Sequence, residues 1–240
     1  MTGSRRLREL GGRLKQRAHA LLGRESIARG SVPPLERTPE VRSDRFLFIG
    51  GLHRSGTSIV HRLLCEHPQM SGFQDTGVPE DEGQYLQSLF PIGRAFGGPG
   101  RFAFDPAASL DDLAATWTAE QTETLLREWG AYYDLSKPVL LEKSPPNLVR
   151  HAFLQRVFPK ARFLFILRHP VCVALATRKW AKTTAVELLL HWHVAYRALA
   201  GSALGEKVLI MRYEDFVADS RTHLQRIYDL VGAGPFEPAE

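Results

Sequence analysis

Short runs of apolar residues alternate along the chain with longer segments in which apolar residues recur at helical spacing. Four short runs, at 46–49, 139–143, 162–168 and 207–211, are apolar on both faces, as buried strands of a parallel sheet are. Helical patterns begin at 59 and cover about 110–134, 145–158, 170–182, 185–204 and 221–231. Strands that alternate with helices predict an α/β fold, with a P-loop-like parallel sheet and helices on both faces in a single domain.

Two segments interrupt this alternation. Residues 31–39 are rich in proline, so we expect an N-terminal arm and linker over 1–41 and one domain over 42–240. Residues 69–106 are rich in glycine and proline and contain no clear periodic pattern. Connections of this length inside a compact domain are usually functional.

Polar residues that can carry chemistry follow each of the four predicted strands. Arg54 follows the first, Lys143 ends the second, Arg168 follows the third and Tyr213 follows the fourth. Because ligands of parallel α/β sheets bind at the carboxyl ends of the strands, we expect these side chains to share one site.

The segment after the first strand predicts a phosphate-binding loop. Its glycines allow backbone N–H groups to approach an anion, and the dipole of the following helix favours negative charge. The spacing from Gly51 to Gly56 is that of a P-loop, but Thr57 stands where nucleoside triphosphatases have a lysine. The cation lies inside the loop instead, at Arg54.

This pattern, Arg-Ser-Gly-Thr-Ser at 54–58 after a strand, resembles the 5′-phosphosulfate loop of sulfotransferases that use 3′-phosphoadenosine 5′-phosphosulfate (PAPS). The resemblance covers most of residues 45–232, and residues 50–74 look similar to the protein-tyrosine sulfotransferase type. It implies an enzyme that moves a sulfuryl group from PAPS to a hydroxyl or amine and releases adenosine 3′,5′-bisphosphate. Arginine and lysine replace magnesium in this chemistry, so no metal is expected.

The resemblance also implies roles for individual residues. Lys143, in Glu-Lys-Ser-Pro-Pro, corresponds to the lysine that stabilises the transition state, and Arg168 to the arginine that holds the 3′-phosphate. The family serine eight residues after that arginine is absent, because Ala176 stands there, and Thr177 is the candidate substitute. The remaining nucleotide contacts implied are Arg54, Ser55, Gly56, Thr57, Ser58 and Tyr213.

For the general base, the resemblance implies a carboxylate in the loop-rich segment 69–106. The Lys-Thr-His context of cytosolic sulfotransferases is missing, whereas the tyrosine-sulfotransferase type uses a glutamate soon after a His-Pro pair. Counting without gaps from His67 and Pro68 leads to Asp75, with Glu82 as the second candidate. A carboxylate near Arg54 stays ionised and can accept a proton.

The positive charge is concentrated at the N-terminus. The net charge is +5, and residues 1–30 hold eight Lys and Arg against two Glu. Leucines recur at helical spacing there, so the arm is either a basic amphipathic helix in peripheral contact with an anionic membrane or a loosely docked terminal helix. The folded part has no basic stripe and no aromatic platform, which argues against nucleic-acid binding.

The sequence gives weaker indications of the cellular compartment and of whether the chain is complete. The two cysteines form neither a metal spacing nor a disulfide framework, and neither a secretory signal nor a membrane span is visible. We therefore expect a cytoplasmic protein. Sulfotransferases usually have a further C-terminal segment over the nucleotide, so either the chain is truncated at Glu240 or the arm or a partner covers that site.

Two other functions remain open at this point. One is a nucleoside-phosphate kinase on the same fold, which would need the loop lysine and a magnesium-binding aspartate. The other is a degenerate, membrane-associated protein that only binds a nucleotide or an anionic lipid. The acceptor can be a small molecule, a carbohydrate or a peptide, and its pocket is expected over 69–106 and the helix after it.

Overall fold

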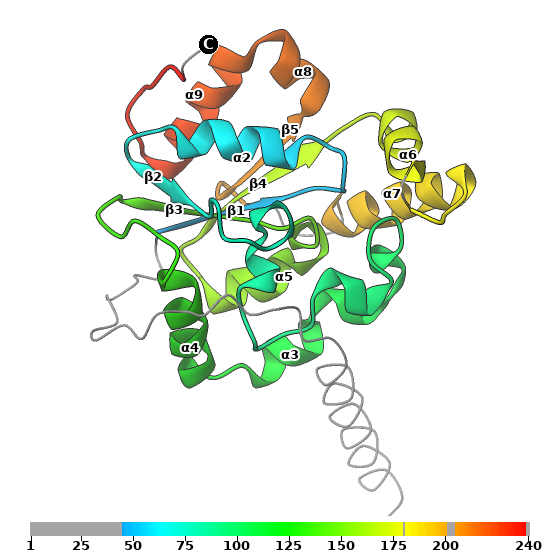
Figure 1. The fold of residues 1–240 in the computed structure, drawn as a ribbon, viewed down its shortest axis with the longest axis horizontal. Coiled ribbons are helices and arrows are strands. Elements are labelled where there is room, and N and C mark those ends of the chain that lie inside the picture. Colours follow the sequence, from blue (N-terminus) through cyan, green and yellow to red (C-terminus); the bar gives the residue numbers. More distant parts are fainter. Residues whose placement is uncertain (1–44, 180, 201–204, 239–240) are drawn as a thin grey trace, which may run out of the picture. The chain divides into compact units, whose positions relative to one another are not determined.

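The computed structural model describes residues 45–179, 181–200 and 205–238, which contain one parallel sheet of five strands (Figure 1). The strands are β1 (Phe46–Gly50), β2 (Met70–Gly72), β3 (Val139–Lys143), β4 (Arg162–Leu167) and β5 (Val208–Arg212). Their order across the sheet is β2-β3-β1-β4-β5, and every neighbouring pair is parallel. β1 is central, so the loop that follows it lies between the ends of β3 and β4.

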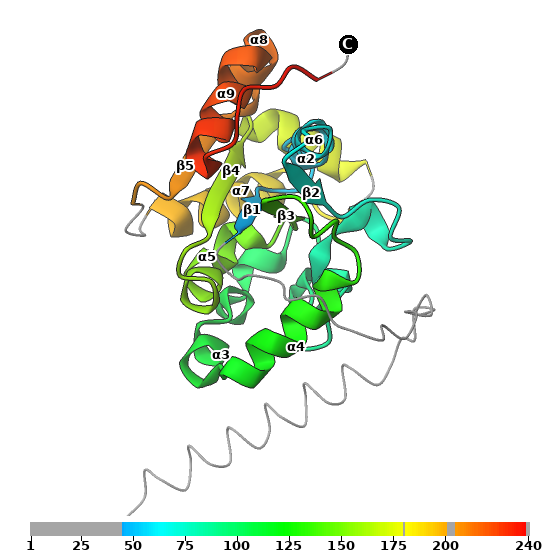
Figure 2. The same ribbon diagram turned by 90° about the vertical axis from the view of Figure 1, so that its left-hand side faces the viewer.

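Helices cover both faces of the sheet, as the sequence pattern predicts. The helices are α2 (Thr57–Cys65), α3 (Asp111–Thr116), α4 (Ala119–Gly130), α5 (Asn147–Val157), α6 (Pro170–Arg178), α7 (Ala185–Ala200), α8 (Tyr213–Ala218) and α9 (Ser220–Val231). Figures 1 and 2 show α2, α8 and α9 above one face, and α3, α4 and α5 beyond the other. The α/β fold class is confirmed.

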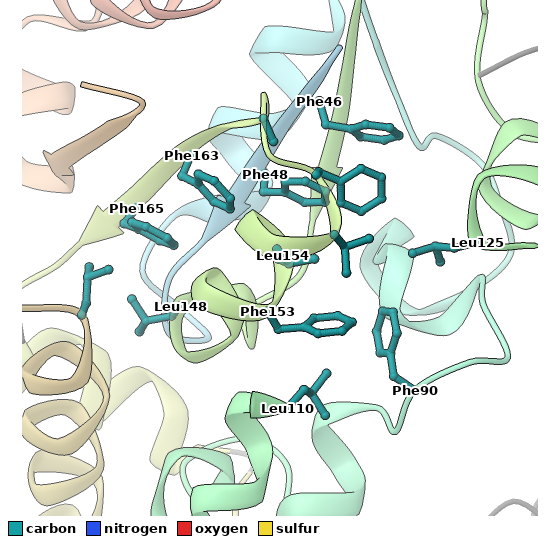
Figure 3. Packing of buried hydrophobic residues seen from close by; sticks show 14 of the residues in the cluster. Phe46, Phe48, Phe90, Leu110, Leu125, Leu148, Phe153, Leu154, Phe163 and Phe165 are labelled. Carbon is teal, nitrogen blue, oxygen red and sulfur yellow. The ribbon is translucent and has the colours of Figure 1, made fainter. Parts of the chain in front are cut away.

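The central strand β1 shows why the sheet needs two cores. All five of its residues are buried, and alternate side chains point to opposite faces. Phe46 and Phe48 pack on the α5 side, where Phe48 stacks on Phe163 of β4 with ring centroids 5.6 Å apart (Figure 3). Leu47 and Ile49 belong to the separate cluster under α2 and α9.

Three local predictions differ from the structure. Strand β2 was not expected, because its three residues are too few to show a period. The predicted helix over 110–134 is in fact two helices. The first, α3, ends at Thr116, and Thr118 caps the N-terminus of the second, α4. The helix α8 directly after β5 was also missed, although Tyr213 was expected at this strand end.

The long segment between β2 and α3 is ordered by short 3₁₀ turns and by one buried arginine. Arg150 of α5 is fully buried and donates from Nε to the carbonyl of Ala108 (3.2 Å) and from Nη2 to that of Pro91 (2.9 Å). Its guanidinium also lies 5.7 Å from the ring centroid of Phe90. These contacts fix both ends of residues 91–108 against α5.

The basic arm and the domain boundary near residue 41 lie outside the described residues. Across the part of the chain that the structure does describe, no helix combines the length and the apolar character that crossing a membrane requires.

Candidate active site

The loop between β1 and α2 has a backbone that depends on glycine. Gly51 has φ 155° and Gly56 has φ 101°, while Arg54 itself adopts the left-handed region at φ 69°. A Cβ atom on Gly56 would overlap the ring of Tyr213, which lies directly against it. The sequence places Thr57 at the first turn of α2, so the loop presents a helix N-terminus at the carboxyl edge of the sheet.

Arg168 joins the ends of three strands. Its Nη1 donates to the carbonyl of Arg54 (2.9 Å), and its Cζ lies 4.5 Å from the ring centroid of Tyr213. Its own carbonyl accepts a hydrogen bond from Nε1 of Trp192 (2.9 Å). The structure therefore brings Arg168 and Tyr213 together with the backbone of Arg54 at one edge of the sheet.

Lys143 ends β3 with its ammonium buried against residues 80–82. Its Nζ donates to the carbonyl of Glu80 (2.5 Å) and lies 3.7 Å from Oε1 of Glu82. Glu80 also reaches the first turn of α2, because its Oε2 accepts a hydrogen bond from Ser58 Oγ (3.1 Å). Burial lowers the pKa of Lys143, and the carboxylates around it oppose that effect.

Glu82 is a buried carboxylate at this lysine. Burial raises its pKa to about 7, although the charge of Lys143 and the hydrogen bond from Gln84 Nε2 act in the opposite direction. A carboxylate with a pKa near neutrality can take up and release a proton at physiological pH. Of the two predicted bases, Glu82 is the one that contacts Lys143.

Asp75, the first candidate base, lies elsewhere in this loop. It is exposed and adopts φ 54°, and its backbone N–H supports the carboxylate of Asp81. Oδ1 of that Asp81 carboxylate accepts hydrogen bonds from the N–H (2.9 Å) and the Oγ1 hydroxyl (2.6 Å) of Thr76. Glu80 and Asp81 also have positive φ, so three non-glycine residues of this short loop are in a sparsely populated conformation.

Glu142 is a functional candidate that the sequence reasoning missed. It is buried inside β3 and accepts hydrogen bonds from Ser144 Oγ (2.6 Å) and Asn147 Nδ2 (2.5 Å). Asn147 Nδ2 also donates to the carbonyl of Ile49, and Ser144 Oγ accepts from the N–H of Gln84 (3.1 Å). A glutamate within an apolar strand was the available signal, since a buried carboxylate requires such partners.

The remaining predicted residues lie in the loop after β1, at the start of α2 and on α6. Ser55 and Thr57 are buried, and Ser58 makes the contact to Glu80 already described. Thr177 is buried on α6, and its Oγ1 has no hydrogen-bond partner within the described part of the chain. That hydroxyl remains a candidate ligand group, although no contact joins it to Arg168.

A cavity of about 630 Å³ opens beside this site. His53, from the loop between β1 and α2, lies in its wall, together with Gln84 and with Pro146 before α5. The pKa of His53 is lowered to about 3, chiefly by burial and further by the nearby charges of His191, Lys143 and Arg54. His53 is therefore the wall residue on which the charges of Arg54 and Lys143 act, although neither cation lines the cavity itself.

Sequence comparisons relate the chain to known proteins. At 25% identity over 124 residues it matches "Protein-tyrosine sulfotransferase 2" of Gallus gallus, with 51% of this chain and 30% of that protein covered. It also matches "Omega-hydroxy-beta-dihydromenaquinone-9 sulfotransferase Stf3" of Mycobacterium bovis at 25% identity over 206 residues, or 73% of this chain and 47% of that protein. The chain thus spans less than half the length of both relatives.

Comparison with solved structures shows the same fold. The "Sulfotransferase Domain from the Curacin Biosynthetic Pathway" superposes with a TM-score of 0.52 at 18% identity, covering 83% of this chain and 77% of that one. The profile described as "Sulfotransferase family" matches residues 47–238, which is most of the chain. The chain therefore belongs to the sulfotransferase family.

Proposed function

We propose that the protein transfers a sulfuryl group from PAPS to a hydroxyl or amine and releases adenosine 3′,5′-bisphosphate. The observation that carries this proposal is the meeting of Arg54, Arg168 and Tyr213 at the carboxyl ends of β1, β4 and β5, with Lys143 at the end of β3. Membership of the sulfotransferase family supports it.

The donor set suits a doubly phosphorylated nucleotide. The glycine loop and the N-terminus of α2 would hold the 5′-phosphosulfate with Arg54, and Arg168 would hold the 3′-phosphate. When bound, PAPS supplies the activated sulfuryl group and a phosphate as leaving group. Arg168 is already oriented by the Tyr213 ring and by the carbonyl of Arg54, so its guanidinium loses little freedom on binding.

Lys143 and Glu82 would act on the groups that react, at the sulfuryl end of the bound nucleotide. In the transfer the acceptor oxygen or nitrogen bonds to sulfur, the bond between sulfur and the 5′-phosphate oxygen breaks, and the proton of the acceptor passes to Glu82. The ammonium of Lys143 offsets the negative charge that develops on the leaving oxygen. The contact of 3.7 Å between these two groups supports Glu82 over the exposed Asp75 as the base.

The kinase alternative lacks its essential groups. Thr57 begins α2 at the position where a P-loop lysine would stand, and the strand ends carry Lys143 and Arg168 in place of a magnesium-binding aspartate. No observation of the described residues favours the kinase over the sulfotransferase.

Binding calorimetry with adenosine 3′,5′-bisphosphate tests the proposal, with ATP and magnesium as the competing ligand. We expect metal-independent binding of the bisphosphate that Arg168→Ala weakens at least about tenfold, because a charge-assisted contact to phosphate is lost. Arg226→Ala, an exposed arginine of α9, is the matched control. Preference for ATP with magnesium would overturn the proposal in favour of a kinase.

A further inference from the structure

The cavity beside His53 carries an excess of positive charge. Arg94 and Arg101 reach it from the loop after β2, and Lys182 reaches it from the turn between α6 and α7. These cations come from two chain segments more than eighty residues apart, so the fold and not a local charge run brings them together. Among the described residues that line the cavity, none is Asp or Glu.

The groups around the cavity affect these charges differently. Glu187 of α7 lies 3.4 Å from Arg101 and offsets its charge. His53 adds no charge at neutral pH, because burial lowers its pKa to about 3. Lys182 is exposed and makes no ion pair within the described part of the chain. The cavity rim is therefore positive, whereas its walls are Pro79, Pro99, Pro146 and glycine backbone.

The size and lining of the cavity fit a small organic molecule. Its volume of about 630 Å³ lies in the range of small-ligand pockets. Gln84 and Tyr85 add hydrogen-bonding groups to the apolar surface. Burial raises the pKa of the Tyr85 hydroxyl, and the nearby charge of Arg94 opposes that rise. The cavity is partly open to solvent, so an acceptor can enter it directly.

We infer that the sulfuryl acceptor is a small molecule that carries an anionic group, a carboxylate or a phosphate, apart from the hydroxyl or amine that reacts. The anionic group would lie between Arg94 and Lys182, and the reacting group would point past His53 toward Lys143. This inference rests on the proposed function, which it makes more specific by naming the substrate class.

Matched pairs of compounds test the inference by direct binding. The pairs are 4-hydroxyphenylacetate with 4-methylphenol, 6-hydroxyhexanoate with hexanol, and glycerol 3-phosphate with glycerol. Ligand-observed NMR on the full chain, with and without adenosine 3′,5′-bisphosphate, gives the affinity of each member. We expect at least one charged member to bind about tenfold or more tightly than its neutral partner, with a preference that declines as salt is raised.

Two variants connect the preference to the cavity. Arg94→Ala with Lys182→Ala should reduce the preference to less than about twofold, and Arg226→Ala on α9 should preserve it. The affinity for adenosine 3′,5′-bisphosphate should stay unchanged in the double variant. If that affinity drops instead, these cations serve the nucleotide and the inference is wrong.

The two proposals fail in different ways. Loss of bisphosphate binding by the unmodified chain would contradict the proposed function, whatever the compound pairs show. Equal binding of charged and neutral members, or no binding of any charged member at about 10 mM, would overturn the anionic acceptor while the nucleotide result stands.

Discussion

At the scale of single residues, the site depends on a few side chains whose surroundings alter their ordinary chemistry. Glu82 is nearly as buried as a core leucine, yet it must accommodate the ammonium of Lys143. Gly56 is required by a neighbour as well as by its own φ, because any side chain there would displace the Tyr213 ring. Neither residue can change without disturbing a second part of the site.

The raised pKa of Glu82 predicts how the reaction rate depends on pH. If its carboxylate is the base, kcat/KM should fall as the pH drops below about 7, because protonation removes the acceptor of the proton. Glu82→Gln should lower kcat about 10²- to 10⁴-fold, the usual contribution of a general base. Steady-state kinetics from about pH 5 to about pH 9, a range of roughly two units on either side of the pKa of Glu82, would measure both effects.

Asp75→Asn is the matched comparison for this prediction. Asp75 is the first base that the sequence suggested, and it is exposed in the same loop. We expect the Asp75 variant to keep most of its activity and its pH profile. A large loss in that variant, together with a mild effect of Glu82→Gln, would reverse the assignment.

At the scale of elements, caps and strand ends decide where the polypeptide turns. The start of α4 is a capping box in which Thr118 Oγ1 accepts from the N–H of Gln121 (3.2 Å) and Gln121 Oε1 accepts from the N–H of Thr118 (2.9 Å). Trp129 of this helix donates from Nε1 to the carbonyl of Gly83 (3.0 Å). The position of α4 therefore supports the segment that contains Glu82.

Thr118→Ala should lower the free energy of unfolding by about 1 kcal/mol, because the cap satisfies backbone donors that the alanine leaves open. Thr116→Ala, at the exposed end of α3, should change it by less than about 0.5 kcal/mol. Urea denaturation of both variants gives the two values. Equal effects would show that the capping box does not stabilise α4.

The elements that could be predicted from sequence are those with local signals. β1, β3, β4 and β5 were predicted because continuous apolar runs are typical of strands buried on both faces. β2 has only three residues, and the Thr-x-x-Gln cap at 118–121 was hidden within a continuous apolar period. Both depend on contacts that a short window does not contain.

Some residues of the candidate site also have local sequence signals, and others do not. Arg54, Lys143, Arg168 and Tyr213 could be placed from sequence because each follows a recognisable strand. The network around Glu142 was missed, although Ser144 and Asn147 lie close to it in the sequence. The hydrogen bond from the N–H of Gln84, sixty residues before Ser144, has no local signal. Such pairings follow from the tertiary structure and leave no spacing in the chain.

At the scale of the whole molecule, the proposed nucleotide site is built from separate strands of one sheet. Arg168 after β4 bonds to the loop after β1 and stacks on Tyr213 after β5. A ligand held by these groups would add contacts between elements that these side chains already join. Its binding should consequently stabilise the domain as a unit.

Adenosine 3′,5′-bisphosphate at about 100 times its Kd should raise the free energy of unfolding by about 2.7 kcal/mol. For a chain of this size that corresponds to an increase in Tm of about 5–10 °C, which differential scanning calorimetry would detect. AMP, which lacks the 3′-phosphate, should produce a smaller increase. An Arg168→Ala variant that shows the full increase would contradict the assignment of this arginine.

The central position of β1 has a consequence for how the chain is made. Its hydrogen-bonded neighbours, β3 and β4, begin 89 or more residues after β1 ends. At a synthesis rate of roughly 5–20 residues per second, the apolar β1 strand waits about 5–20 s for its first partner. Over that interval, both of its edges are open to pairing with other chains. The nascent protein should therefore need a chaperone most before β3 leaves the ribosome.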